Sequence, residues 1–249
     1  MGTLSFLDTE FTDLATPELL SLGLVTLDGR EHYVELDLST EDGQARMRAS
    51  SDFVRYGGVL DMWGLVPGAA ATELEMGRRT AEWLLGLAFE SGSRVEVAFD
   101  YSTDFELLEY AIRDSGLWDR VREVVTPVDV GAITGSSEGE LAAEGCFREL
   151  ANRGLRRHHA LADAIALREA YVAVKALAMQ MAHTTHTNTY RQLVQHTLFQ
   201  GLDEAWLRTW LRVPAFGLNG RKPMDVLDEP GGLEALQDLV TRIATGTYS

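Results

Sequence analysis

The sequence predicts an α/β domain with a mixed sheet flanked by helices, followed by a small all-helical C-terminal domain. Over the first 172 residues, short apolar strands come first and then alternate with amphipathic helices, which is typical of a mixed sheet. From residue 191 onward the apolar residues recur only at helical spacing. We therefore expect an α/β domain over residues 1–175, a helical linker over 176–196 and a helical domain over 197–249.

Three strands are expected at the start of the chain, at residues 3–8, 19–27 and 32–38. The second and third are joined by Asp28-Gly29, a dipeptide typical of a tight hairpin turn. The chain therefore opens as a meander of short strands.

Helices and strands then alternate. Apolar residues between charged ones predict an amphipathic helix over 73–90. The same reasoning gives the remaining elements of the domain: strand 95–99, helix 103–114, strand 121–130, helix 138–151 and helix 160–181. The polar, β-branched stretch at 183–190 favours a linker or helix boundary. Helices follow at 191–200, 203–212 and 231–245.

The composition excludes several classes of protein. With 45% apolar and 24% charged residues the chain is neither disordered nor fibrous. Its one cysteine, Cys146, cannot form an internal disulfide, which favours a reducing compartment. Residues 1–10 lack a basic leader, and no run of 18 apolar residues occurs, so we expect a cytoplasmic protein without signal peptide or membrane span.

The negative charge is concentrated in the first part of the chain. The formal net charge is −16, and residues 1–172 contain 31 acidic and 15 basic residues, whereas residues 173–249 contain seven of each. Such a field repels polyanions and argues against a basic nucleic-acid clamp. Bound divalent cations would reverse this locally, because a loaded carboxylate site attracts phosphate.

Asp8 and Glu10 form the first candidate site. Side chains two residues apart on a strand project from the same face, so both carboxylates point one way. Like charges so close are unfavourable unless a cation lies between them. The alternative is a solvated strand end.

Asp104 and Asp163 each lie near the start of an expected helix. Asp100 and Asp104 bracket the turn after strand 95–99, where a capping role for Asp104 is the alternative to metal binding. Asp163 stands among alanines and needs a partner if it is buried. His158 can approach it only from the loop before the helix, and a helix-end charge with a surface histidine is the alternative.

Taken together, three segments resemble the histidine-containing branch of the DEDD 3′–5′ exonuclease superfamily. The resemblance covers about residues 3–172 and is greatest for the small bacterial exoribonuclease-like members. It rests on Asp-x-Glu on the first strand, on an Asp, Asp104, that opens a helix after strand 95–99, and on His-x4-Asp-Ala at the start of a late helix. The neighbouring residues agree with it, in Phe6-Leu-Asp-Thr-Glu-Phe11, Glu18-Leu-Leu-Ser-Leu-Gly-Leu-Val25, Asp28-Gly-Arg30 and His158-His-Ala-Leu-Ala-Asp-Ala164.

The resemblance implies a ribonuclease H-like fold and a set of site residues. The metal-binding acids would be Asp8, Glu10, Asp104 and Asp163, and His158 would be the base. His159 is a second candidate for the base. Asp100 stands where many members have Asn.

The implied chemistry is hydrolysis of single-stranded RNA or DNA from a free 3′ end, with RNA favoured. Two metal ions about 3.5–4 Å apart would suit four carboxylates, and all-oxygen ligands favour Mg²⁺ or Mn²⁺. Histidine, with an ordinary pKa of about 6.5, can accept a proton from water near neutral pH. Arg153, Arg156 and Arg157 either meet the phosphates or are solvated, and Phe11 and Leu14 either contact the terminal base or belong to the core.

The C-terminal segment is similar to the toxin-binding domain of the Xre/MbcA/ParS antitoxins. Its pattern is carried by Pro214, Gly220, Pro223, Val226, Leu227, Arg242, Ile243 and Gly246. The resemblance implies a protein partner, commonly a RES-type toxin, bound through residues 197–249. The whole chain then suggests an exonuclease with a protein-binding module, which could also form a homodimer. The alternative is an antitoxin-like protein whose nuclease fold is a scaffold or a nucleic-acid binder.

Overall fold

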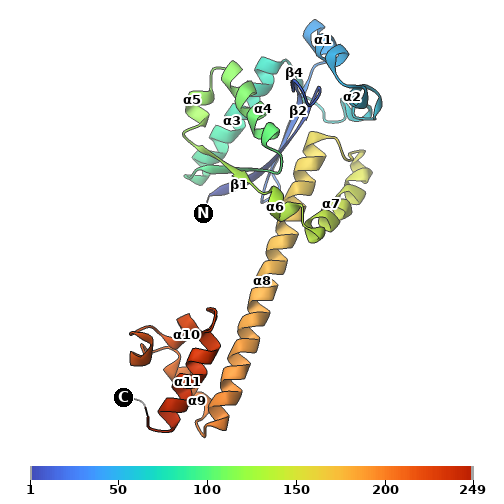
Figure 1. Cartoon of the computed structure of the whole chain (residues 1–249). Helices are drawn as coiled ribbons and strands as arrows, with labels where there is room; N and C mark the ends of the chain where they lie inside the picture. The colour runs from blue at the N-terminus through green and yellow to red at the C-terminus, as the bar shows by residue number, and fades with distance from the viewer. Residues whose placement is uncertain (1, 248–249) are drawn as a thin grey trace. The chain divides into compact units, whose positions relative to one another are not determined.

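In the computed structural model, which describes residues 2–247, a six-stranded mixed sheet organises the first part of the chain (Figure 1). The chain divides into two units, Met1–Lys175 and Ala176–Ser249. The strand order is β4-β3-β2-β1-β5-β6. The strands are β1 (Thr3–Phe11), β2 (Leu19–Thr26), β3 (Glu31–Leu36), β4 (Ala70–Ala71), β5 (Val95–Phe99) and β6 (Val125–Asp129).

The sheet is antiparallel across β1, β2 and β3 and parallel at both edges, where β4 pairs with β3 and β5 and β6 follow β1. β2 pairs antiparallel with both β1 and β3, whereas β5 runs parallel to β1 and β6 parallel to β5. Every residue of β2 is buried, as expected for a strand in the interior of the sheet. The expected α/β fold class with a mixed sheet is therefore confirmed.

Helices cover both faces of the sheet. Side chains on one face, such as Leu7 and Leu22, pack in one core with α3 (Glu73–Ser91), α4 (Ser102–Asp114) and α5 (Trp118–Val121). Side chains on the other face, such as Phe6 and Val25, pack with α7 (Ser137–Leu150) and the start of α8 (Ala160–Phe199). The alternation of side chains along β1 therefore assigns its odd and even positions to different cores.

Gly23 allows α8 to approach the sheet closely. A Cβ atom placed on Gly23 would lie 2.4 Å from the carbonyl oxygen of Ala160, well inside van der Waals contact. Gly23 pairs with Asp8 across the β1–β2 ladder. The absence of a side chain at this position therefore brings the first turn of α8 over the middle of β1.

Several elements differ from the sequence-based expectation. The expected strand over 121–130 begins only at Val125, because Trp118 and Val121 form the buried face of the short helix α5. Four elements were not expected from the sequence: α1 (Glu41–Ala49), α2 (Asp52–Tyr56), β4 and α6 (Gly131–Thr134). Two of these helices have side-chain N-caps, Thr40 and Ser51, that signal a helix start.

The second unit is helical. Its core contains Leu193 from the end of α8 together with Leu207, Leu211, Leu236 and Val240. The other four come from α9 (Glu204–Trp210), α11 (Gly232–Ala244) and the segment between them. That segment holds two short helical turns, η3 (Phe216–Leu218) and α10 (Pro223–Val226). The core of this unit therefore includes residues that precede residue 197.

The prediction of a break at residues 183–190 is wrong, because α8 runs without interruption from Ala160 to Phe199. Three threonine hydroxyls donate to the carbonyl oxygen four residues earlier, among them Thr184 to Gln180 at 2.9 Å and Thr187 to His183 at 2.9 Å. These local bonds satisfy the hydroxyls within the helix. Over residues 2–247, none of the helices has both the length and the apolar character that crossing a bilayer requires.

Candidate functional site

A cavity of about 1230 Å³ opens in the first unit at the end of β1. Its lining includes the carboxylates of β1, the loop after β5, the first turn of α8 and parts of α2 and α7. The pairing of β1 with β2 shifts register between Glu10 and Phe11, at the end of β1. Irregularities of this kind re-aim side chains at the end of a strand.

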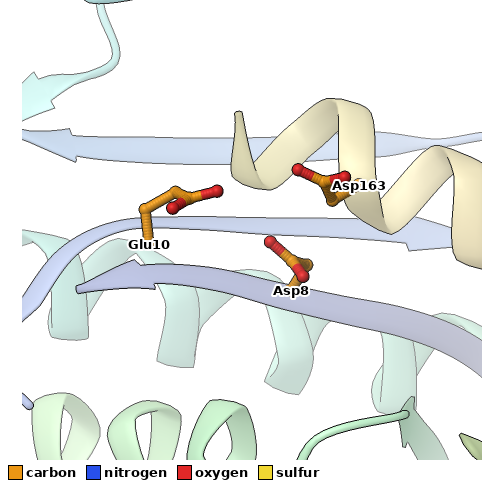
Figure 2. Close-up of side chains that lie close together, drawn as sticks. All are labelled: Asp8, Glu10 and Asp163. Carbon is orange, nitrogen blue, oxygen red and sulfur yellow. The ribbon is translucent and has the colours of Figure 1, made fainter. Parts of the chain in front are cut away.

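Asp8, Glu10 and Asp163 form the centre of the cavity. Each offers one carboxylate oxygen, and these three oxygens all lie within 4.8 Å of one another. Figure 2 shows Asp8 and Glu10 projecting from the same side of β1 toward Asp163 on α8. Three of the four acids that the sequence singled out as metal ligands therefore converge on one point.

The backbone before α8 orients Asp163. One oxygen, Oδ2, accepts hydrogen bonds from the amides of His158 at 2.7 Å and His159 at 3.1 Å. The Asp163 side chain therefore accepts from backbone amides just before its own helix. These amides also favour the negatively charged form of the carboxylate. Because both bonds go to Oδ2, the other oxygen, Oδ1, is left for interaction with a ligand in the cavity.

Asp104 lies in the same cavity but is held separately from the cluster of three. It is buried in the first turn of α4, and its Oδ1 accepts from the Thr9 hydroxyl at 2.6 Å and the Thr9 amide at 3.1 Å. Thr9 lies between Asp8 and Glu10 and points toward the other face of the sheet. Asp100, after β5, also lines the cavity.

Burial and mutual repulsion raise the pKa values of these acids. Burial is the main cause in each case. It acts with the charges of neighbouring carboxylates to raise the pKa of Glu10 to about 8, and it raises the pKa of Asp104 and of Asp163 to about 7. The pKa of Asp8 is raised well above its ordinary value by burial and by Asp163 and Asp104. A bound cation would remove this cost by stabilising the charged forms.

The structure separates the two candidate histidines. His158 lines the cavity and is exposed, with its ring edge-on to Phe53 at 4.9 Å between ring centroids. Its φ angle is +68°, a backbone conformation that is uncommon outside glycine and often occurs at functional sites. Burial lowers the pKa of His158 below its ordinary value, with a further contribution from Arg157. The neutral ring, which can accept a proton, therefore predominates at neutral pH.

His159 faces the interior instead. It is buried, and its ring stacks on Tyr33 at 4.5 Å between centroids with an interplanar angle of 24°. Burial lowers the pKa of His159 to about 4. Within the described residues, neither ring nitrogen has a hydrogen-bond partner. Of the two candidates, only His158 lies where a base could reach the carboxylate cluster.

The arginines before α8 are all engaged with acidic side chains. Arg153 makes a bidentate pair with Glu31 at 2.9 and 2.8 Å, and Arg156 pairs with Asp61 at 2.9 Å. Arg157 pairs with Glu144 and lies over the ring of Phe147. Arg157 lines the cavity, whereas Arg153 and Arg156 do not.

Phe11 and Leu14, the candidates for contact with a terminal base, differ in their surroundings. Both line the cavity, but Phe11 is partly buried against the main core whereas Leu14 is exposed. Sequence reasoning missed Thr9 and Phe53. Thr9 could have been noticed from its position between two acids on a strand. Phe53 gave no such signal, because it lies on α2, a helix that was not expected from the sequence.

The segment after α9 shows why the C-terminal pattern contains glycine and proline. Gly220 and Gly246 adopt positive φ angles of +77° and +68°, which favour glycine. Pro223 occupies the first turn of α10, where a missing amide costs nothing. Trp206 and Trp210 stack on one side of α9 at 5.4 Å between centroids.

The fold and the cavity together define an α/β domain with a buried carboxylate cluster, attached to a helical unit. Residues 196–246 match the family described as the antitoxin Xre/MbcA/ParS C-terminal toxin-binding domain, which confirms the resemblance expected for this segment. No curated protein matches the chain. The exonuclease resemblance of the first unit stays a prediction.

Proposed function

We propose that the first unit is a metal-dependent 3′–5′ exonuclease that hydrolyses single-stranded nucleic acid, RNA in preference to DNA. The observation that carries this proposal is the convergence of carboxylate oxygens from Asp8, Glu10 and Asp163 within 4.8 Å, in a cavity that His158 also lines. The mixed sheet, with two of these acids on its central strand β1, supports a ribonuclease H-like fold.

The donor set fits divalent cations. The converging groups are all carboxylates, and hard cations such as Mg²⁺ and Mn²⁺ prefer oxygen ligands. Asp8, Glu10 and Asp163 would hold them, with Asp104 at the edge of the same cavity. When bound, two such ions supply a water-derived nucleophile at neutral pH and relieve charge on the leaving oxygen.

The residues of the chain have separate tasks in this proposal. His158 accepts a proton from the attacking water, because its ring is neutral at neutral pH and reaches the cavity. Phe53 supports that ring edge-on. Thr9 is a positioning residue, since its hydroxyl and amide both bind Oδ1 of Asp104 and leave Oδ2 as the oxygen available to the cavity.

Stepwise shortening of 5′-labelled single-stranded RNA and DNA in Mn²⁺ tests the proposal. We expect Asp163→Asn and Asp8→Asn each to lower the rate at least about a thousandfold, because metal-based stabilisation accounts for several kcal/mol of a barrier. Glu123→Gln, an exposed acid outside the cavity, is the matched control and should keep the full rate. Undiminished hydrolysis by Asp163→Asn, or hydrolysis that persists in chelator, would contradict the proposal.

The second unit supports a second function, binding of a RES-type toxin. The family match of residues 196–246 favours it and is independent of the carboxylate cluster. Its test is co-purification of the full chain with the RES-domain product of a neighbouring gene. Phe216 is an exposed side chain of the second unit, and Phe216→Ser tests whether its surface takes part in binding the toxin. The Asp8→Asn variant and the unaltered chain can then be compared for neutralisation of the toxin. Equal neutralisation would show that the antitoxin role does not require hydrolysis by the first unit.

A further inference from the structure

Three buried polar residues lie behind the carboxylate cluster and contact one another in series. They are Glu35 and Tyr33 on β3 and His159 just before α8, and they are 1%, 9% and 3% exposed, respectively. All three lie outside the lining of the cavity. Any effect that they have on the site must therefore pass through the residues that they hold in place.

Strand pairing places Tyr33 in line with the acids of the cluster. Asp8 pairs with Gly23 across β1 and β2, and Gly23 pairs with Tyr33 across β2 and β3. Residues directly opposite each other in antiparallel strands project from the same face of the sheet. The first turn of α8 lies over Gly23, in the middle of this row. The row therefore meets the start of α8 at two points, where Tyr33 contacts His159 and where Asp8 faces Asp163.

Glu35 holds the hydroxyl end of the Tyr33 ring. The Tyr33 hydroxyl donates to Oε2 of Glu35 at 2.9 Å, and Oε1 of Glu35 accepts from the backbone amide of Gly64 at 2.9 Å. Burial and the charge of Glu35 raise the pKa of Tyr33, so the hydroxyl keeps its proton and remains a donor. The ring is therefore fixed at one end and presents its face to His159.

The side chain of His159 is held by its ring face. Its ring stacks on that of Tyr33 at 4.5 Å between centroids, with 24° between the ring planes. Neither ring nitrogen has a hydrogen-bond partner within residues 2–247. Aromatic rings at this separation attract each other beyond the effect of the area that they bury. The stack on Tyr33, and not a hydrogen bond of the imidazole, therefore fixes this side chain.

The backbone of His159 is bonded to Asp163 in both directions. The His159 amide donates to Oδ2 of Asp163 at 3.1 Å. The His159 carbonyl oxygen accepts from the amides of Ala162 at 2.7 Å and Asp163 at 3.0 Å. A shift of His159 would therefore move the carboxylate of Asp163, which has an oxygen within 4.8 Å of oxygens from the other two acids of the cluster.

We propose that Tyr33 is a positioning residue for the metal site, because its ring, held by Glu35, fixes His159 and thereby sets where the carboxylate of Asp163 lies. Tyr33 acts from outside the cavity and touches neither cation nor substrate. This inference rests on the proposed function and adds to it a residue that keeps the cluster in place from behind. Removing a group that orients a metal ligand lowers metal affinity about 10–100-fold.

Mn²⁺ affinity of the full chain, measured by isothermal titration calorimetry, tests the proposal. Tyr33→Leu removes the stack, and we expect at least about tenfold weaker binding. Tyr33→Phe keeps the ring and should remain within about threefold of the unaltered chain. Unchanged affinity in Tyr33→Leu overturns the proposal. Equal losses in the two variants would assign the effect to the hydroxyl and overturn it as well.

Trp83→Leu is the matched control. His32, the neighbour of Tyr33 on β3, projects from the opposite face of the sheet and stacks on Trp83 at 5.3 Å between centroids, also with 24° between the ring planes. Loss of this stack should lower the stability of the fold but leave Mn²⁺ affinity unchanged. A comparable loss of affinity in Trp83→Leu would show that general destabilisation is the cause, and the proposal would fall.

His159→Leu removes the same stack from the other side and carries the test if Tyr33→Leu does not fold. It leaves the hydrogen bond between Tyr33 and Glu35 in place. We expect the same loss of Mn²⁺ affinity as in Tyr33→Leu and no further loss in the double variant, since both changes break one interaction. Losses that add in the double variant contradict the proposal.

Hydrogen exchange measured by NMR without added metal separates this inference from the nuclease function. The amides of His158 and His159, which donate to Asp163, should exchange at least about tenfold faster in Tyr33→Leu than in the unaltered chain. If the unaltered chain neither binds Mn²⁺ nor hydrolyses RNA or DNA but exchange responds in this way, the nuclease function falls and the positioning of Asp163 by Tyr33 stands. If the chain hydrolyses its substrate while exchange and Mn²⁺ affinity stay unchanged in Tyr33→Leu, the nuclease function stands and this inference falls.

Discussion

The acids of the site lie on both faces of the sheet, and Thr9 shows why. Asp8 and Glu10 point toward α8, while Thr9 between them points toward α4 and holds Asp104 with two hydrogen bonds. Alternation along a strand requires this separation. The four acids therefore form a cluster of three with a fourth beside it, instead of a single cluster of four.

The raised pKa values of the acids predict how metal-free stability depends on pH. The pKa of Asp163 is about 7 in the folded chain against an ordinary value of 3.8, and that of Glu10 is about 8. Folding therefore takes up protons between about pH 4 and 8, so stability falls as pH rises through this window. Differential scanning fluorimetry should show a lower Tm at pH 8 than at pH 5.5, and Mn²⁺ should raise the Tm more at pH 8.

Asp163→Asn should reduce that pH dependence. The amide oxygen of Asn can still accept from the backbone amides of His158 and His159, but it carries no charge. We expect the metal-free variant to have a Tm about 3–6 °C higher than the parent at pH 8, corresponding to about 1–2 kcal/mol. An equal or lower Tm at pH 8 would show that repulsion among the carboxylates does not limit stability.

The two neighbouring histidines give opposite predictions. His158→Asn removes the proposed base but suits the positive φ angle, because asparagine tolerates this conformation. We therefore expect a loss of about 10²–10⁴ in kcat with unchanged circular dichroism. His159→Phe preserves the stacking on Tyr33 and should keep kcat within about threefold. Equal losses in the two variants would mean that His158 is not the base.

At the scale of elements, the contact between β2 and α8 builds the site. Asp163 reaches Asp8 because Gly23 lets the first turn of α8 rest on the sheet, where a side-chain carbon on residue 23 would lie only 2.4 Å from the carbonyl oxygen of Ala160. The helix supplies both the acid and, through the loop before it, the histidine. Small shifts of α8 therefore change the distances within the site.

Gly23→Ala tests this contact. The added methyl group must push α8 away, so we expect a loss of about 1–3 kcal/mol in the free energy of unfolding and at least tenfold weaker Mn²⁺ binding by isothermal titration calorimetry. Gly86→Ala on α3 is the matched control, because its Cβ meets nothing within 4 Å and alanine favours the helix. Unchanged Mn²⁺ affinity in Gly23→Ala would show that the position of α8 does not set the site.

The helix α8 also shows where sequence patterns mislead. Threonine and histidine at residues 183–190 are unfavourable for a helix by propensity. In the structure the threonine hydroxyls bond to carbonyl oxygens within the helix, and Nδ1 of His186 lies 2.7 Å from a carboxylate oxygen of Asp228. Asp228 is 42 positions away, so no local pattern could reveal it.

At the scale of the whole molecule, the chain joins two units with different charge. The first 172 residues carry all of the net charge of −16, whereas residues 173–249 have no net charge. Several acids of the first part line the cavity. The second unit, whose net charge is close to zero, contains the segment that is similar to a toxin-binding domain.

The fold class, the shared orientation of Asp8 and Glu10, and the likeness of the C-terminal segment to a toxin-binding domain could all be predicted from the sequence. These features follow from periodicity along a strand or helix and from local motifs, which neighbouring residues specify. Four features became visible in the folded chain: which histidine lines the cavity, the bond of Thr9 to Asp104, the pairing of Arg153, Arg156 and Arg157 with acids, and the continuity of α8. Each of these depends on partners distant in sequence or on the direction of a side chain, and spacing along the chain encodes neither.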